Sequence, residues 1–330
     1  MSRLLQIIMI AGLAALAGCN GTATQNLLTV DFEQDKALKY KFYSGRDIYI
    51  KWDAGGEKEA TTNKGFEKSS ESVEMVMSYR PVDVNPYGLT TIRATCESVR
   101  VGRNAEQGRV SRGKDAVESI RGKSFTFTVG PTGKIEDSTE LYELIKQAGK
   151  KAFRSDSKRG RIKDPDLIDD FIATQWFLWD SISSLEDVTK GAHIGQSWTS
   201  RLLVPTSMVL REARDVTYRL EQIRETPEGR IAVIGCSYTL SESVPRGWPI
   251  PYTGRFQMSG TFGFFRSMLR GLKATNLQGK GEVLFNIDAG QIEQYNHQYE
   301  VHIRAGAIGP LGLNPLIKIE QTLTLQLLEK

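Results

Sequence analysis

The stretch Val73-Glu74-Met75-Val76-Met77-Ser78-Tyr79 places an apolar side chain at every second position. Successive side chains of a strand point to opposite faces, so this spacing predicts a strand with one buried and one wet face. Strands of that kind are typical of antiparallel sheets. The same period recurs in four further sets: Phe125, Phe127 and Val129; Val283, Phe285 and Ile287; Tyr299, Val301 and Ile303; and Ile317, Ile319, Leu323, Leu325 and Leu327.

The same series of landmarks occurs twice in the same order along the chain. The first copy runs from Val76-Met77-Ser78-Tyr79-Arg80 through Gly88, Cys96 and Gly122 to Gly133, and the second runs from Val216-Thr217-Tyr218-Arg219 through Gly229, Cys236 and Gly279 to Gly290. Each glycine that follows an apolar strand pattern predicts a tight hairpin turn. The order favours an internal duplication, with two similar meanders as the alternative.

Helical periodicity lies between the two copies. Asp137 and Glu140 resemble a capping box, and an Asp164-Pro165 pair predicts the start of a second helix. The apolar stripes of the two helices are Leu141, Leu144, Ile145, Ala148 and Ala152, and then Ile168, Phe171, Ile172, Gln175, Trp179 and Ile182. We therefore predict a β-rich α+β protein of two related, curved antiparallel sheets, half-barrel in form, with helices between them.

Length and composition set the limits of this prediction. The chain has 330 residues, of which 40% are hydrophobic, so it can bury one or two substantial cores and is not a disordered protein. It has 43 Lys and Arg against 39 Asp and Glu, a net charge of +4. Three cysteines are too few for a disulfide scaffold.

The first nineteen residues predict an address. Arg3 precedes an apolar run over residues 4–16, and Leu16-Ala17-Gly18-Cys19 follows. The run is shorter than the ~20 residues that span a bilayer, so it indicates a cleaved signal peptide over residues 1–18. The tetrapeptide resembles the bacterial lipobox, which implies lipidation of Cys19. Asn20 is not the Asp that marks inner-membrane retention, so we expect an outer-membrane lipoprotein that faces the periplasm.

The pattern divides the chain into five parts. They are the leader (residues 1–18), a lipidated tether (19–35), a first β-rich repeat (36–136), a helical connector (137–190) and a second β-rich repeat (191–330). The second repeat carries an insert over residues 245–276. The layout of residues 36–330 resembles bacterial envelope lipoproteins known as domains of unknown function, and more weakly the half-barrel envelope proteins that carry lipoproteins and lipids. This resemblance implies a concave apolar sheet face that accepts acyl chains.

The sequence offers little for catalysis or metal binding. His297 and His302 are five residues apart and so point to opposite faces of a strand, and no cysteine pair has zinc-ligand spacing. The acidic cluster Asp164, Asp166, Asp169 and Asp170 stands at a helix start, where capping and dipole compensation explain it better than catalysis or calcium. We expect no enzyme activity, no metal and no cofactor.

Cys96 and Cys236 occupy equivalent positions in the two copies. Each lies on an apolar strand face, so we favour small buried residues over a disulfide that would staple the halves. Trp176 and Trp179 share one side of the second helix and are interpreted as core rather than a sugar-stacking platform.

Two basic segments stand out. Residues 150–163 carry seven Lys or Arg and a single acid, Asp156, and residues 243–281 contain no Asp or Glu at all. The second segment interleaves basic and aromatic residues, which predicts a mouth for an amphiphile with an anionic head; a longer hairpin that fills the core is the alternative. The candidate ligand-binding residues are Arg246, Trp248, Tyr252, Arg255, Phe256, Phe264, Arg266 and Arg270.

These observations predict a protein that acts by binding. Its expected partners are the membrane, through the lipid on Cys19, and an amphiphilic or apolar envelope ligand. The alternative is a structural or assembly lipoprotein that holds another envelope protein. Nucleic acid is not an expected partner in the envelope.

Overall fold

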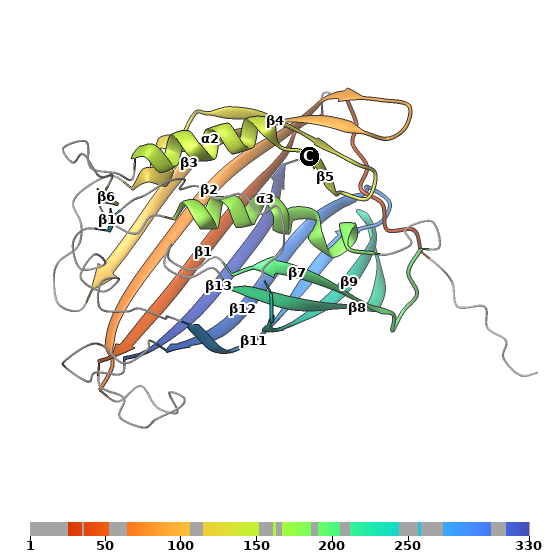
Figure 1. Cartoon of the computed structure of the whole chain (residues 1–330). Helices are drawn as coiled ribbons and strands as arrows, with labels where there is room; N and C mark the ends of the chain where they lie inside the picture. Colours follow the sequence, from red (N-terminus) through yellow and green to blue (C-terminus); the bar gives the residue numbers. More distant parts are fainter. Residues whose placement is uncertain are drawn as a thin grey trace, which may run out of the picture.

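The computed structural model describes residues 26–34, 36–52, 65–105, 115–151, 161–162, 167–185, 191–204, 212–243, 257–258, 273–304 and 315–329. One antiparallel sheet of eleven strands dominates this part of the chain (Figure 1). Its strands are β1 (Leu38–Lys51), β2 (Glu67–Val84), β3 (Thr90–Ala105), β4 (Ser124–Val129), β5 (Ile135–Asp137), β7 (Ser197–Leu203), β8 (Ala213–Thr226), β9 (Gly229–Leu240), β11 (Lys273–Asn286), β12 (Gln291–Arg304) and β13 (Leu316–Glu329). A separate parallel ribbon pairs β6 (Arg161–Ile162) with β10 (Gln257–Met258).

The strand order explains how the halves meet. Across the sheet it reads β5-β4-β3-β2-β1-β13-β12-β11-β9-β8-β7. Neighbours in the sheet are therefore consecutive in sequence except at β9 and β11, between which β10 of the ribbon intervenes, and at β1 and β13, the first and last strands. Their pairing runs from Lys39 opposite Glu329 to Lys51 opposite Leu316.

The prediction of two separate sheets is wrong. The β1–β13 pairing joins both strand-rich halves into one sheet and so satisfies two backbone edges that would otherwise be open. The helices follow β5 in the sequence, as expected, but they cover the concave face of this one curved sheet (Figure 1).

The predicted hairpin turns are confirmed. The landmark glycines join β2 to β3, β8 to β9, β4 to β5 and β11 to β12, and all have positive φ: Gly88 (80°), Gly229 (121°), Gly133 (83°) and Gly290 (61°). Glycine adopts this region without steric cost. The duplication stays a prediction, because Gly122 lies at the turn before β4 whereas its proposed counterpart Gly279 lies inside β11.

Two α-helices form where the stripes predict them. They are α2 (Thr139–Lys151) and α3 (Ile168–Ser183), and a short 3₁₀ turn, η1 (Ala116–Ile120), precedes β4. The described stripe residues of α2 and all those of α3 are buried. Because α3 is also buried on its polar positions, among them Thr174 and Gln175, the interface between helix and sheet is not uniformly apolar.

The predicted capping box of α2 is not formed, because Asp137 and Glu140 each accept from another residue. The carboxylate of Asp137 accepts a hydrogen bond from the backbone N–H of Thr139 at 3.0 Å. Glu140 accepts instead from the backbone N–H of Thr126 in β4, at 2.7 Å, and thus ties the helix to the sheet.

The acidic cluster at the start of α3 has a second role. Asp164 and Asp166 lie outside the described residues, whereas Asp169 and Asp170 occupy the first turn of α3. Asp170 is buried and forms an ion pair with Arg46 of β1. Capping and dipole compensation therefore do not account for Asp170.

Residues 26–34, here called the N-terminal strap, cross one end of the sheet. They belong to the segment that we predicted as a tether. Their backbone bonds to Ala192 before β7, Pro131 between β4 and β5, and Gly290 between β11 and β12, at 2.9, 3.2 and 3.0 Å. The strap therefore connects both sides of the sheet. Within the described part of the chain, no helix is long and apolar enough to cross a membrane.

Candidate functional site

A single row of side chains crosses the concave face at one level of the sheet. The pairing register from β3 to β8 aligns Arg103, Glu71, Arg46, Gln321, Tyr299, Gly279, Tyr238 and Val216. We call these residues the polar row. Apolar rows lie on both sides of the polar row. The next row on one side contains, in the central strands, Ile48, Ile319, Val301 and Leu277. The second row on the other side contains Val99, Met75, Phe42, Leu325, Tyr295, Val283, Ile234 and Leu220.

The strand patterns carried a signal for this row that the sequence analysis missed. The apolar positions of the last strand include Ile319 and Leu323 and skip Gln321 between them, and Glu71 continues the phase that begins at Val73. A polar residue at the buried phase of an alternating strand must find a partner inside the protein. That interruption of the pattern is the observable clue.

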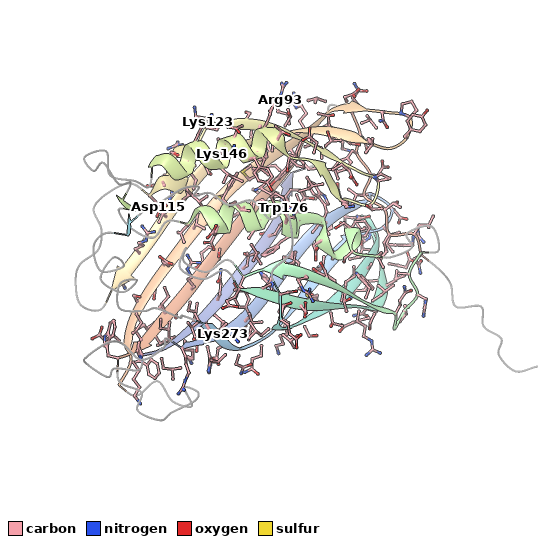
Figure 2. The ribbon with its side chains drawn as sticks, viewed as in Figure 1. Arg93, Asp115, Lys123, Lys146, Trp176 and Lys273 are labelled. Atoms are coloured by element: carbon pink, nitrogen blue, oxygen red, sulfur yellow. The ribbon has the colours of Figure 1, made fainter. Side chains whose placement is uncertain are left out.

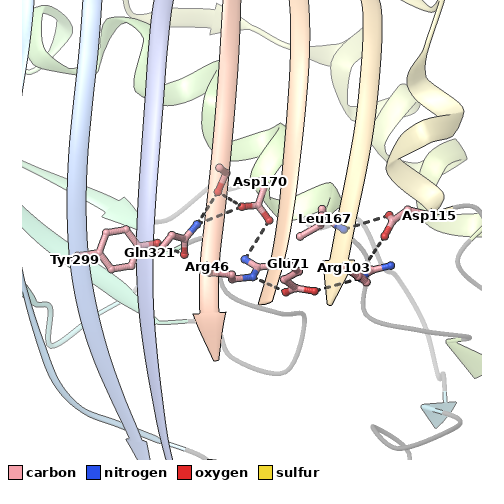
Figure 3. A network of polar contacts seen from close by, with 9 residues as sticks. Arg46, Glu71, Arg103, Asp115, Leu167, Asp170, Tyr299 and Gln321 are labelled. Carbon is pink, nitrogen blue, oxygen red and sulfur yellow. Dashed lines mark hydrogen bonds and ion pairs between the residues drawn. The ribbon is translucent and has the colours of Figure 1, made fainter. Parts of the chain in front are cut away.

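Charged members of the polar row form a buried network under the start of α3 (Figure 3). The guanidinium of Arg46 lies between two carboxylates, with Nε 2.5 Å from Oε1 of Glu71 and Nη1 3.1 Å from Oδ2 of Asp170. Arg103 pairs with Glu71 at 3.3 Å and also with Asp115, the N-cap residue of η1. The network thus joins β1, β2, β3, η1 and α3.

Burial and the arginines act in opposite directions on these carboxyl groups. Burial alone would raise the pKa of Glu71, but the charges of Arg46 and Arg103 outweigh it and hold that pKa below its usual value. Burial dominates at Asp170 and Asp115 and raises both pKa values, although an arginine opposes it at each. Glu71 is therefore the firmly ionised carboxylate of the network.

A chain of neutral hydrogen bonds continues the row. The hydroxyl of Tyr299 donates to Oε1 of Gln321 at 2.6 Å, and Nε2 of Gln321 donates to Oγ of Ser44 at 2.9 Å. Ser44 in turn donates to Oδ1 of Asp170 at 2.7 Å. This chain of contacts from β1, β12 and β13 therefore helps to fix where α3 lies on the sheet.

A second buried charge, Arg214 of β8, lies on the other side of Tyr299. Its guanidinium carbon is 4.6, 4.5 and 5.1 Å from the ring centres of Phe177, Tyr238 and Tyr299. Nη1 donates to Nδ1 of His297 at 3.1 Å, while Nε and Nη2 have no hydrogen-bond partner among the described residues. No carboxylate of the described chain lies within ion-pair distance of this fully buried arginine.

The neighbours of Arg214 do not neutralise its charge by contact. Asp180 of α3 accepts hydrogen bonds from Tyr218 at 2.7 Å and from Ser200 at 2.8 Å instead. Burial lowers the pKa of His297 well below its usual value, and the charge of Arg214 lowers it further, so the imidazole is neutral. Arginine has no acceptor atom, so Nδ1 must accept and the ring proton resides on Nε2.

The residues predicted to bind ligand lie outside the described parts of the chain. This holds for Cys19 and for all eight candidates of the insert: Arg246, Trp248, Tyr252, Arg255, Phe256, Phe264, Arg266 and Arg270. The chain is described again from Lys273, the first residue of β11 (Figure 2). Of residues 245–276, the ribbon strand β10 is also described, and it pairs with β6 of the basic linker.

A groove of about 1020 Å³ crosses the outer face of the same strands. One line of its wall follows the register through Gly102, Ser72, Gly45, Thr322, Gln298 and Lys280. Small side chains at this level and the ring of Tyr43, which lies over Gly45, shape the groove. Most of the residues that line it are polar or charged and it is open to solvent, so it is not the purely apolar hollow implied by the resemblance to lipid carriers.

The structure also shows where the candidate metal ligands and the two cysteines of the strands lie. His297 pairs with Leu323 and His302 with Lys318 in β13, so the two histidines lie on opposite faces of the sheet, as expected. The described residues hold no group of three His, Cys, Asp or Glu arranged to bind a metal ion. Cys96 and Cys236 are buried and free, which confirms the preferred interpretation of these cysteines.

The two thiols are expected to resist alkylation in the folded protein. Burial raises the pKa of each from 9.0 to about 11, so the reactive thiolate is rarer by roughly 100-fold at pH 8. We expect iodoacetamide to label both cysteines slowly at pH 8 in the native chain and rapidly in urea, as followed by mass spectrometry. Equal labelling rates in the two states would contradict the buried positions.

Comparisons with known proteins give only distant likenesses. No family model matches the chain, and no curated protein matches it in sequence. A solved structure described as "Lipid-protein interactions in lipovitellin" aligns with 91% of this chain at 10% identity and a TM-score of 0.44, over 26% of its own length. The chain thus spans about a quarter of lipovitellin.

Two bacterial structures align more weakly. Acinetobacter baumannii OccAB4 and Pseudomonas aeruginosa OpdL each match 89% of this chain and 99% of their own at 11% identity, with TM-scores of 0.20 and 0.19. TM-scores below 0.5 do not establish a shared fold. These likenesses therefore assign the chain to no family.

Proposed function

We propose that this chain is a lipid-anchored protein of the bacterial envelope that binds an amphiphile with an anionic head and performs no catalysis. The pairing of β6 with β10 carries the proposal. It places Arg161 and Ile162 of the basic linker beside Gln257 and Met258 of the acid-free insert, two segments about a hundred residues apart in the sequence. Concentrated positive charge beside aromatic side chains suits an anionic amphiphile.

The position of the β6–β10 ribbon indicates how the proposed binding end is oriented relative to the membrane. The ribbon and the N-terminal strap lie at opposite ends of the sheet (Figure 1). Strand β1 has 14 residues, which at ~3.3 Å each place about 46 Å between its ends. Cys19 precedes Asn26 of the strap by seven residues, or at most about 25 Å of chain. An anchor at Cys19 would keep the strap near the membrane, with the basic end directed into the periplasm.

The described residues support binding over catalysis. The two free thiols are buried and their pKa values are raised, which makes them poor nucleophiles. His297 is neutral and engaged by Arg214 and Tyr238 through the same nitrogen, so it is not placed as a general base for an external substrate.

Native mass spectrometry of the protein extracted from its own membrane tests the proposal. We expect an acylated Cys19 and a co-purified amphiphile whose occupancy falls at least about tenfold in an Arg255→Glu/Arg266→Glu/Arg270→Glu variant, since the loss of favourable charge and the repulsion both weaken anion binding. The matched control reverses three exposed arginines on the outer face of β2 and β3, Arg80, Arg93 and Arg100, and should keep its ligand.

Absence of any amphiphile together with unchanged uptake by the insert variant would refute the proposal. Crosslinking in cells distinguishes the alternative: one abundant envelope-protein partner, captured equally by both charge-reversal variants, would favour an assembly role.

A further inference from the structure

The unpartnered donors of Arg214 belong to one edge of its guanidinium. Nη1, on the far side, donates to His297, while Nε and Nη2 have no hydrogen-bond partner in the described chain. Their N–H bonds point side by side, in the fork arrangement that binds two oxygens of one carboxylate or phosphate. The free edge of Arg214 thus has the geometry of an oxyanion receptor.

The surroundings favour an anion at this edge. The three aromatic rings around Arg214 exclude water, and a low dielectric strengthens any hydrogen bond formed there. His297, which accepts from Nη1 through Nδ1, offers no acceptor to the free Nε and Nη2 edge. Donors therefore outnumber acceptors in this cluster.

The local backbone is built around the cluster. Gly281 of β11 lies opposite His297, and a Cβ there would stand 2.6 Å from Cβ of His297 and 2.9 Å from the hydroxyl of Tyr238. A Cβ on Gly279 would meet Cβ of Tyr299 at 2.5 Å. Two glycines inside one strand thus permit the rings that enclose Arg214.

Arg214 also lies at the base of the insert. It pairs with Leu240 in β9, and the acid-free segment begins three residues later, at Ser243. We propose that the Nε and Nη2 edge of Arg214 binds the anionic head, a carboxylate or a phosphate, of an amphiphile held on the concave side of the sheet. This assignment rests on the proposed function and names the group that the protein recognises.

Three probes test the assignment on the full lipidated chain, stripped of co-purified lipid and held in a non-ionic detergent. They are myristate, its uncharged methyl ester, and inorganic phosphate at matched ionic strength. Tryptophan fluorescence titration should show myristate binding at least tenfold more tightly than the ester. Phosphate should raise the melting temperature of the wild type.

Two variants separate charge from fork geometry. Arg214→Met should bring the affinities for acid and ester within about twofold, and Arg214→Lys, which keeps the charge but lacks the two-pronged edge, should weaken myristate at least tenfold. Arg201→Lys, at an exposed arginine of the neighbouring strand β7, should change neither value. Circular dichroism checks that each variant folds. The wild-type comparison of acid with ester needs no variant.

The outcomes separate this inference from the proposed function. Equal binding of acid and ester would overturn the oxyanion site and leave amphiphile binding intact. Stabilisation by phosphate that depends on Arg214, without binding of either amphiphile, would keep the oxyanion site and overturn the proposed function. No response to any probe would overturn both, with internal water as the partner of these donors.

Discussion

Replacing Arg46 by Met is expected to lower the free energy of unfolding by about 3–5 kcal/mol, the usual cost of leaving a buried charge without its partner. The side chain of Arg46 is 1% exposed and is the ion-pair partner of Asp170 within this network. Its removal leaves Asp170 with hydrogen bonds from Ser44 and Gln321 only, and leaves Glu71 with Arg103. Urea unfolding followed by tryptophan fluorescence measures the loss.

The pH dependence of this loss identifies its electrostatic origin. Burial already raises the pKa of Asp170 in the wild type, and without Arg46 it rises further. A carboxyl whose pKa is higher in the folded than in the unfolded chain destabilises the fold as pH rises above the unfolded value of ~3.9, and protonation relieves the penalty. The deficit of Arg46→Met should therefore be largest near pH 8 and shrink towards pH 5.

Two controls bound this prediction. Arg93→Met, at an exposed arginine on the outer face of β3 (Figure 2), should change stability by less than about 0.5 kcal/mol. Adding Asp170→Asn to Arg46→Met should restore part of the loss. A deficit that stays the same from pH 5 to pH 8 would show that lost packing, and not lost charge pairing, dominates.

Replacing Trp179 by Ala is expected to cost about 3–5 kcal/mol of unfolding free energy, as for other buried large-to-small changes. Its ring lies 5.8 Å from Tyr79, 5.7 Å from Phe127 and 6.0 Å from Phe32 of the strap, measured between ring centres. The deletion would open a cavity where α3, the sheet and the strap meet. The same unfolding measurement applies, with near-ultraviolet circular dichroism as a second probe.

The neighbouring tryptophan is the matched control. Trp176 is only partly buried at the edge of the core, so Trp176→Ala should cost clearly less than Trp179→Ala. Equal losses would contradict the placement of Trp179. Its burial confirms that it belongs to the core and is not part of a sugar-stacking platform.

Burial of the charged groups in the polar row costs free energy, but it specifies the position of α3 on the sheet. An apolar helix on an apolar sheet can slide with little penalty, whereas buried charges must meet defined partners. Arg46 and Asp170 pair at one position of the helix only, and Tyr79 fixes a second contact by donating to Gln175 at 2.8 Å. The polar contacts specify position, while the surrounding apolar rows supply most of the stabilisation.

Local patterns in the sequence were sufficient for strands, turns and helices. The alternation from Val73 to Tyr79 predicted β2, and Gly88 and Gly133 predicted hairpin turns, because these signals depend on residues close together in the chain. The helix stripes predicted α2 and α3 for the same reason. The polar row could not be predicted in this way, because Arg46, Glu71 and Gln321 lie far apart in the sequence. Each interrupts an apolar pattern singly, and only the pairing of their strands brings them together.

The sequence by itself determined the β-rich class, the hairpins and the two helices, and the address at Cys19 stays a prediction. Tertiary structure alone decided that β1 pairs with β13, which turns two expected sheets into one, and that polar residues from six strands align in a single row. The physical reason is range. Propensity and periodicity act within a few residues, whereas strand partners are selected by burial and backbone hydrogen bonding between segments more than 250 residues apart, as with Arg46 and Gln321.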